Sequence, residues 1–310
     1  MDPREHILIC MDLSEMDDSL IRYGNFLVEQ FSPKSVTFLH VMQSYDISPE
    51  ILAEFPHLEE PVSRVVQEEL EEKIGALFTR KDDTKTLVRV EEGVTTDTII
   101  RYTRENQISL TLMGKKIGYE GKGGVVRKVI SLIPSSVLLI SETTFPRIRQ
   151  VLVRMEFSRI SNMALRVAMQ IGERTGASLS CHHVHKLPLK YFPQSSPESD
   201  EKLLNYVEKF GRREYNKFLK RYKWEGRDIP NLSTSVDPGN EEADLLYRKA
   251  VALGVDLIVI GSRVKSELAD ILIDTTSEKL ASSDKNLPVL IVKDRKQTLG
   301  FLTALFKHKS

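Results

Sequence analysis

One stretch of sequence, residues 255–264, restricts the possible folds of this chain more than any other. It reads Val-Asp-Leu-Ile-Val-Ile-Gly-Ser-Arg-Val, a short apolar segment that runs directly into a glycine. A continuous run of Leu, Ile and Val predicts a strand that is buried on both faces, as in a parallel sheet covered by helices. Residues 109–116, Ser-Leu-Thr-Leu-Met-Gly-Lys-Lys, repeat the pattern. Parallel sheets bind ligands beyond the carboxyl ends of such strands, so each copy marks a place where a ligand site is expected.

The elements around these two stretches follow the same order twice. In the first copy, one strand ends in Asp-Leu-Ser at 12–14 and the next ends in His-Val at 40–41. In the second copy, Glu-Phe-Ser at 156–158 and His-Val at 183–184 take the same places. Five strands alternate with four helices in each copy. This pattern predicts an α/β fold with two tandem open parallel five-stranded sheets flanked by helices.

The repeat predicts three parts of the chain: domain 1 (1–145), domain 2 (146–294) and a C-terminal tail (295–310). The tail has an amphipathic pattern, because its large apolar residues fall on one side of a helix. These residues are Leu299, Leu302, Leu305 and Phe306. Two interpretations stay open for the tail: a helix that packs back on its own domain, or an exposed element that binds a protein partner or a membrane surface.

The composition excludes several classes of protein. The 310 residues include 44 basic and 44 acidic residues, so no overall charge favours nucleic acid or an anionic membrane as a partner. No apolar run reaches the roughly 18 residues that a membrane-spanning helix needs. Both cysteines, Cys10 and Cys181, fall in apolar strands, which is typical of reduced packing residues. We therefore expect a cytoplasmic protein that does not bind nucleic acid.

With these motifs assembled, the chain resembles a tandem universal stress protein, with two UspA-type domains in one polypeptide. The resemblance extends from about residue 7 to residue 293 and includes the phrase Asp-Leu-Ile-Val-Ile-Gly-Ser-Arg at 256–263. It implies a Rossmann-like fold of the adenine nucleotide alpha hydrolase-like type and a role in the stress response. It also implies that the two domains pair through their fifth strands, 137–140 and 289–292, and that chains form homodimers.

The resemblance further implies a nucleotide site, because ATP-binding members carry Gly-x2-Gly-x9-Gly-(Ser/Thr) after the fourth strand. Such glycines let backbone N–H groups approach phosphates, and the last pair begins a helix whose N-terminus favours negative charge. Domain 1 departs from this motif, since Ile117 replaces the second glycine and the loop is shorter and lacks the final hydroxyl. The residues of domain 1 that would bind ATP with Mg are Asp12, Val41, Gly114, Lys115, Gly118, Gly123 and Gly124. The alternative is a surface loop without a ligand.

Domain 2 departs further from the motif. Its equivalent positions are Glu156, Val184, Gly261, Val264, Asp274 and Thr275. Val264 and Asp274 place a Cβ at both glycine positions, and the Asp274 carboxylate would repel a phosphate. Asp274 is instead a favourable N-cap for the helix that follows. We therefore expect no nucleotide in domain 2, while a ligand without phosphates or an intramolecular plug stays open.

Two other groups of residues were weighed as sites. His182, His183 and His185 lie at the end of one strand, and His183 and His185 share a face. Without a nearby Cys or carboxylate, they are expected to be ordinary strand-end histidines and not metal ligands. The helix over about 200–223 interleaves basic residues with aromatic ones, a pattern that can bind nucleic acid. The spacing favours a buried aromatic stripe. Its aromatic residues are Tyr206, Phe210, Tyr215, Phe218 and Tyr222.

Two functions remain after these comparisons. The first is a regulatory stress-response protein that binds partners, with at most one nucleotide site, in domain 1. The second is an ATP-binding sensor whose domain 1 hydrolyses ATP slowly. The chain has no Gly-x-Ser-x-Gly motif and no paired carboxylates on a motif, so we assign no catalytic residue and expect at most a weak ATPase.

Overall fold

The computed structural model describes residues 6–43, 49–55, 62–79, 81–115, 124–187, 197–237, 239, 242–262, 275–282 and 286–293. These residues form two compact units, one up to Pro146 and the other from Arg147. The predicted tail, 295–310, lies outside the described residues.

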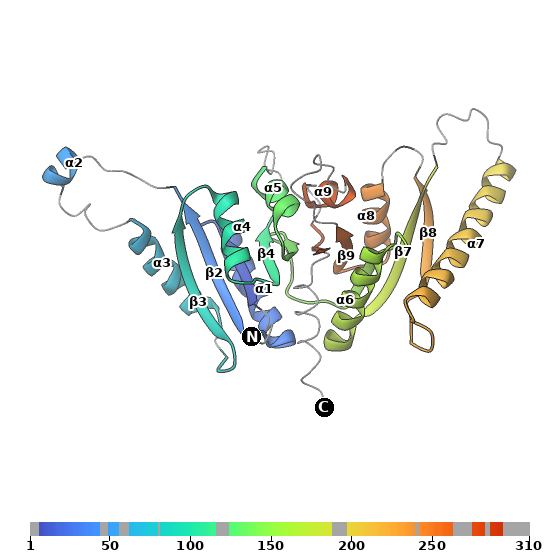
Figure 1. Ribbon diagram of the computed structural model, residues 1–310, viewed down its shortest axis with the longest axis horizontal. Coiled ribbons are helices and arrows are strands. Elements are labelled where there is room, and N and C mark those ends of the chain that lie inside the picture. The colour runs from blue at the N-terminus through green and yellow to red at the C-terminus, as the bar shows by residue number, and fades with distance from the viewer. Residues whose placement is uncertain are drawn as a thin grey trace. The chain divides into compact units, whose positions relative to one another are not determined.

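Domain 1 is an open parallel sheet with the strand order β3-β2-β1-β4-β5 (Figure 1). Its elements are β1 (His6–Met11), α1 (Met16–Phe31), β2 (Ser35–Met42), α2 (Pro49–Glu54), α3 (Val62–Leu77), β3 (Lys85–Glu92), α4 (Thr95–Glu105), β4 (Leu110–Gly114), α5 (Gly124–Leu132) and β5 (Ser136–Ile140). The short helix α2 was not predicted, because its segment is polar and contains proline. The other elements confirm the predicted order.

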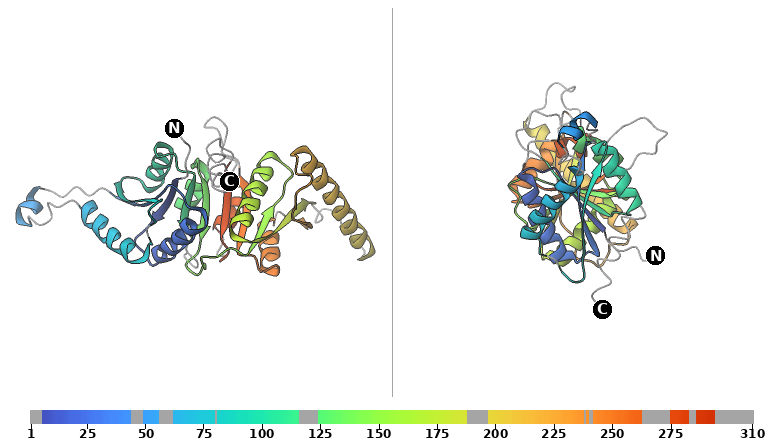
Figure 2. Two further views of the ribbon diagram at one scale, coloured as in Figure 1. Left: turned by 90° about the horizontal axis from the view of Figure 1, so that it is seen from below. Right: turned by 90° about the vertical axis from the view of Figure 1, so that its left-hand side faces the viewer.

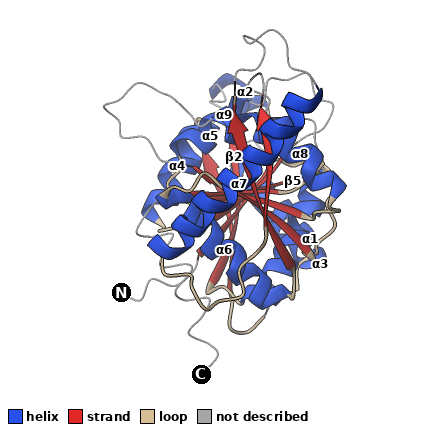
Figure 3. Ribbon diagram, turned by 90° about the vertical axis from the view of Figure 1, so that its right-hand side faces the viewer, coloured by secondary structure: helices blue, strands red, loops and turns tan. Residues whose placement is uncertain are grey.

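Domain 2 repeats this arrangement with the strand order β10-β9-β6-β7-β8. Its elements are β6 (Gln150–Arg154), α6 (Arg159–Thr175), β7 (Ser178–Lys186), α7 (Pro197–Arg221), β8 (Leu232–Asp237), α8 (Glu242–Ala252), β9 (Leu257–Ser262), α9 (Thr275–Ser282) and β10 (Val289–Lys293). The strands form a layer between helices, as the colouring by secondary structure shows (Figure 3).

The core of each domain lies where helices cover both faces of the sheet. In domain 1, α1 and α3 contact one face and α4 and α5 the other (Figure 2). In domain 2, α6 and α7 cover the face that corresponds to that of α1 and α3, and α8 and α9 cover the other face. The central strands are therefore buried on both faces: Leu8 and Ile9 have no exposed surface, and the same holds for Ile258 and Val259. This double burial is the reason why these strands read as unbroken apolar runs.

None of the helices in the described part of the chain has the length and apolar character that crossing a bilayer requires.

Candidate functional site

The loop after β1 is held in place by a carboxylate that the sequence analysis did not single out. Asp17, in the first turn of α1, is fully buried and accepts hydrogen bonds from the backbone N–H groups of Asp12 and Leu13, both at 3.0 Å. Leu13 has a φ of 61°, a left-handed conformation that a leucine rarely adopts. Burial raises the pKa of Asp17 above its ordinary value, although these hydrogen bonds oppose the shift. The loop is thus fixed by buried interactions, while the side chain of Asp12 stays exposed.

Domain 2 builds the same loop with a hydroxyl in place of that carboxylate. The Ser161 Oγ accepts a hydrogen bond from the backbone N–H of Glu156 at 2.9 Å and stands where Asp17 stands in domain 1. Phe157 has a φ of 57° and matches Leu13. Aligning the two copies beyond the acid-x-Ser motif would have identified Asp17 and Ser161. Each is a polar residue in the first turn of its helix, five residues after the acid, and can accept hydrogen bonds from the backbone of the loop.

The His-Val pair at the end of the second strand also has the same structure in both domains. The Nδ1 atoms of His40 and His183 lie 3.1 Å and 2.6 Å from the backbone oxygens of Met11 and Met155. A carbonyl oxygen only accepts hydrogen bonds, so Nδ1 carries the proton in both rings. Each imidazole thereby ties the ends of the first two strands together. It leaves the neighbouring valine, Val41 in domain 1, half-buried at this edge.

The glycine that ends the fourth strand is required by helix packing. A Cβ on Gly114 would lie 2.5 Å from Cγ of Met16, at the start of α1. A Cβ on Gly261 would lie 2.6 Å from Cγ1 of Ile160 and 2.8 Å from its backbone oxygen. Close approach of a helix therefore explains both glycines without any phosphate. This weakens the argument from Gly114 to a nucleotide.

Replacing Gly114 with alanine is expected to destabilise domain 1 by about 1–3 kcal/mol, because Met16 must move out of a packed core. Circular dichroism during thermal unfolding would measure the effect. Gly124→Ala is the matched control, since a Cβ there meets nothing within 4 Å and Gly124 begins a helix. Equal melting temperatures for the two variants would contradict the packing explanation.

The other predicted residues of domain 1 are placed only in part. Lys115 follows β4, is 5% exposed, and donates its backbone N–H to the carbonyl oxygen of Ile140 at 2.8 Å. Gly124 is the first residue of α5 and is exposed. Gly118 and Gly123 lie outside the described residues. The described part of the candidate site therefore brings Asp12, Val41 and Gly114 to one edge of the sheet, at the carboxyl ends of β1, β2 and β4.

In domain 2 this edge is occupied by a buried ion-pair network. Arg154 ends β6 and is 3% exposed, and its Nε atom lies 2.5 Å from a carboxylate oxygen of Glu242, the first residue of α8. The second oxygen of Glu242 accepts from the Thr276 hydroxyl at 3.0 Å and lies 3.1 Å from Nζ of Lys186. Arg154 also pairs with Glu156 at 2.5 Å. Sequence analysis missed Arg154 and Glu242, because they lie far apart in sequence and belong to no motif.

The network fixes the charge state of its central carboxylate. Burial alone would raise the pKa of Glu242, but the hydrogen bonds and charges of Arg154 and Lys186 outweigh it and hold the pKa below the ordinary value. A buried charge of this kind persists only when it is paired and hydrogen-bonded. Domain 1 has uncharged residues at the equivalent places, with Cys10 near the end of β1 and Thr95 at the start of α4.

Three of the degenerate positions in domain 2 can be compared with this network. Val184 is 6% exposed and Gly261 is packed against α6. Glu156 takes part in the network, so the residue that replaces the strand-one aspartate has a structural contact. Val264 and Asp274 lie outside the described residues, as does the side chain of Thr275, the first residue of α9.

The three histidines of β7 make packing and hydrogen-bond contacts. The His182 ring nitrogens lie 2.8 Å and 3.0 Å from the hydroxyl oxygens of Ser233 and Ser235 on β8. His183 and His185 share a face, as predicted, and their ring centroids are 4.3 Å apart. Within the residues that the structure describes, no three His, Cys, Asp or Glu side chains are grouped closely enough to hold a metal ion.

The prediction that all aromatic residues of α7 form a buried stripe is wrong for two of them. Tyr215 and Phe218 are 6% and 1% exposed and pack toward β8. Tyr206 and Phe210 are 67% and 38% exposed. Only one side of α7 faces the sheet. Tyr206 lies outside that side, and Phe210 lies at its margin, with its ring centroid 6.0 Å from that of His185 on β7.

Comparison with known proteins identifies a repeated family match. The model of the universal stress protein family matches residues 3–141 and again residues 147–293. No curated protein sequence matches the chain.

Solved structures of similar fold cover nearly the whole chain. A universal stress protein from Archaeoglobus fulgidus is 20% identical, with a TM-score of 0.60, over 94% of this chain and 98% of that one. A candidate universal stress protein from Pseudomonas aeruginosa is 15% identical, with a TM-score of 0.63, over 97% of this chain and 98% of that one. At these identities the similarity establishes the fold alone.

Proposed function

The chain belongs to the universal stress protein family, and we propose that it is a stress-response regulatory protein with a degenerate nucleotide site, at most one per chain, in domain 1. The observation that carries this proposal is the buried Arg154–Glu242 pair, which occupies the carboxyl edge of the sheet in domain 2. A nucleotide that displaced Glu242 from Arg154 at this edge would leave a buried charge without its partner, which costs several kcal/mol. Domain 2 thus functions as a structural copy, and its side chains fill the place of a ligand.

Domain 1 has the features that a single adenine nucleotide would need at this edge. Asp12 is exposed on a loop that buried hydrogen bonds hold in place, where its carboxylate would accept hydrogen bonds from ribose hydroxyls, and Val41 is half-buried at the end of the next strand. At the position of Arg154, domain 1 has Cys10, so the ion-pair network of domain 2 has no counterpart there. We propose at most one ATP, with Mg, per chain, and slow hydrolysis in domain 1 as the alternative to pure binding.

The proposal includes association of the kind that the family resemblance suggested. The fifth strands, β5 and β10, consist of apolar residues apart from one residue at an end of each, Ser136 and Lys293. Apolar strands at the edge of a sheet must be covered or paired, which supports pairing of the two domains through β5 and β10. A homodimer is proposed from the family resemblance. A cytoplasmic location and a partner for the tail, 295–310, also remain part of the proposal.

A calorimetric titration of the purified chain with Mg-ATP would test the ligand site. We expect at most one site per chain, and Asp12→Ala should weaken binding at that site at least tenfold. Glu156→Ala, the equivalent change in domain 2, is the matched control and should leave the affinity unchanged. Two sites per chain, or equal effects of the two substitutions, would contradict the assignment of the site to domain 1. A chain that binds one equivalent would then be assayed for phosphate release.

A further inference from the structure

The second half of α7 carries a concentration of positive charge that the zero net charge of the chain conceals. Residues 209–221 include six basic residues and one acidic residue. They lie on a helix whose other side packs against β8. A chain with balanced overall charge can therefore still present a strongly basic surface.

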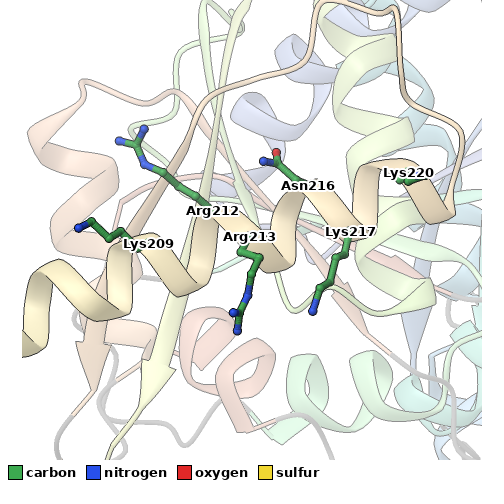
Figure 4. A pocket seen from close by; sticks show the side chains of 6 residues that line it. All are labelled: Lys209, Arg212, Arg213, Asn216, Lys217 and Lys220. Atoms are coloured by element: carbon green, nitrogen blue, oxygen red, sulfur yellow. The ribbon is translucent and has the colours of Figure 1, made fainter.

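The basic residues share one side of the helix. Lys209, Arg213, Asn216 and Lys220 follow one another at intervals of three or four residues, which aligns them along the helix axis. Together with Arg212 and Lys217, they line a shallow surface hollow of about 530 Å³ (Figure 4). From Lys209 to Lys220 this row extends about 16 Å, given a rise of about 1.5 Å per residue. We call the six residues that line the hollow, five of which are basic, the basic row.

The basic row is weakly neutralised within the protein. Arg212 pairs with Glu208 at 2.6 Å, and Glu214 pairs with Lys217 at 2.8 Å and with Arg213 at 3.7 Å. The three basic side chains are at least 60% exposed, and the two carboxylates are 48% and 29% exposed. Exposed pairs of this kind contribute about 0–1 kcal/mol, so an incoming anion can replace them. Among the described residues, no carboxylate forms an ion pair with Lys209. Every lining side chain except Asn216 is solely a hydrogen-bond donor, so the hollow suits an anion.

Two exposed aromatic rings lie beside the basic row. The Tyr206 ring is 67% exposed, one turn before Lys209 and Phe210. The guanidinium of Arg213 lies over the Phe210 ring, 5.1 Å from its centroid, which makes a flat cationic platform. A row of cations next to open aromatic rings is the combination with which proteins bind single-stranded nucleic acid, by phosphate contacts and base stacking.

We propose that the basic row and Tyr206 form a binding surface for single-stranded nucleic acid, without sequence preference. The phosphates would contact the row while bases stack on Tyr206 and on the Phe210–Arg213 platform. An anionic membrane fits the surface less well, because a helix that binds in the membrane interface inserts its apolar side. The apolar side of α7 is turned toward β8, where Phe218 is 1% exposed. This inference is independent of the nucleotide site proposed for domain 1.

Fluorescence anisotropy of a labelled 20-nucleotide oligo(dT), titrated with the full chain at several salt concentrations, would test the surface. The test variant is the triple charge reversal Lys209→Glu, Arg213→Glu and Lys220→Glu. We expect at least a tenfold loss of affinity at low salt. The slope of log affinity against log salt should become flatter by about 2, since each phosphate contact on a single strand contributes about 0.7. Tyr206→Ala should weaken binding about fivefold and leave the slope unchanged.

The matched control places the same change of charge in domain 1, as Arg64→Glu, Lys81→Glu and Lys128→Glu, all at exposed positions. This control should retain most of the affinity. Unchanged fluorescence of Trp224 would show that the α7 variants keep the fold of domain 2, and an unchanged circular dichroism spectrum would show that the domain 1 control keeps its fold. Equal binding by the two triple variants would overturn the proposal. So would binding to phosphatidylserine vesicles, lost in the α7 variant, by a chain that does not bind oligo(dT).

Discussion

Replacing Glu242 with alanine is expected to lower the unfolding free energy of domain 2 by about 3–5 kcal/mol, the largest effect of any substitution considered. The reason is that Arg154, 3% exposed, would keep its charge in the protein interior without its principal partner. The Thr276 hydroxyl and Lys186 would lose the same carboxylate. Such a loss is a large share of the stability of an ordinary domain.

The chain has a single tryptophan, and it reports on domain 2. Trp224 is 3% exposed, and its indole N–H donates to the side-chain oxygen of Asn162 on α6 at 2.8 Å. Urea unfolding followed by tryptophan fluorescence therefore measures domain 2, while circular dichroism measures both domains. Two domains need not unfold in one transition, so the comparison of the two signals is part of the measurement.

Two further variants test whether the loss of stability comes from an unpaired buried charge or only from a lost contact. Glu208→Ala breaks an exposed ion pair on α7 and should cost no more than about 1 kcal/mol. The double variant Arg154→Met, Glu242→Leu removes both charges and should recover most of the stability that Glu242→Ala loses, since apolar replacements of buried pairs are often neutral. If the double variant is as unstable as the single one, the cost does not come from the uncompensated charge of Arg154.

The repeated fold could be predicted from the sequence, because a doubly buried strand has an unmistakable composition. In the strands β1 and β9, the segments 7–11 and 257–260 have no alternation of apolar and polar residues, because both faces are buried. Each strand ends at a recognisable motif. The helix α2 could not be predicted, since six polar and apolar residues with a leading proline carry no periodic signal. The predicted aromatic stripe of α7 was too broad for a similar reason, because the spacing of aromatic residues alone does not say how much of the circumference of a helix the sheet covers.

The candidate site was only partly predictable, because sequence motifs identify where the strands end but not which side chains meet there. Asp12 and Val41 lie at the carboxyl edge, as their strand positions predict, and their role in binding stays a prediction. Arg154 and Glu242 meet across a long interval of sequence, so neither attracts notice on its own. Gly114 fits a phosphate motif and also a packing requirement, since a Cβ there would meet the side chain of Met16, so its role in a nucleotide site stays a prediction.

Acid is expected to destabilise domain 2, through histidines that are buried in their neutral form. Burial lowers the pKa of His182 to about 4, and the charges of Lys249, His183 and His185 add to this effect while Glu242 opposes it. Burial also lowers the pKa of His185 to about 4, although that ring is half-exposed. The unfolded chain has an ordinary histidine pKa of about 6.5 and takes up protons first.

The sign of the effect follows from this difference. Because the folded pKa lies below the unfolded one, the neutral imidazole contributes its full stability above about pH 6.5 and loses it as the pH falls toward about 4. For His182, which is 2% exposed, the loss between pH 7 and pH 4 is about 3 kcal/mol. His185 adds a smaller amount in the same direction, because solvent screens its charge.

Urea unfolding of the wild-type chain and of His182→Gln, followed by Trp224 fluorescence at pH 7 and pH 4, would measure this contribution. Glutamine keeps a hydrogen-bonding group near Ser235 but does not titrate. Both proteins also lose the stabilisation from ionised carboxylates such as Glu242 as the pH falls. The difference between the two proteins therefore isolates the contribution of His182. The variant should lose about 3 kcal/mol less than the wild type over this range. Parallel losses in the two proteins would mean that His182 is protonated as readily in the folded domain as in the unfolded chain.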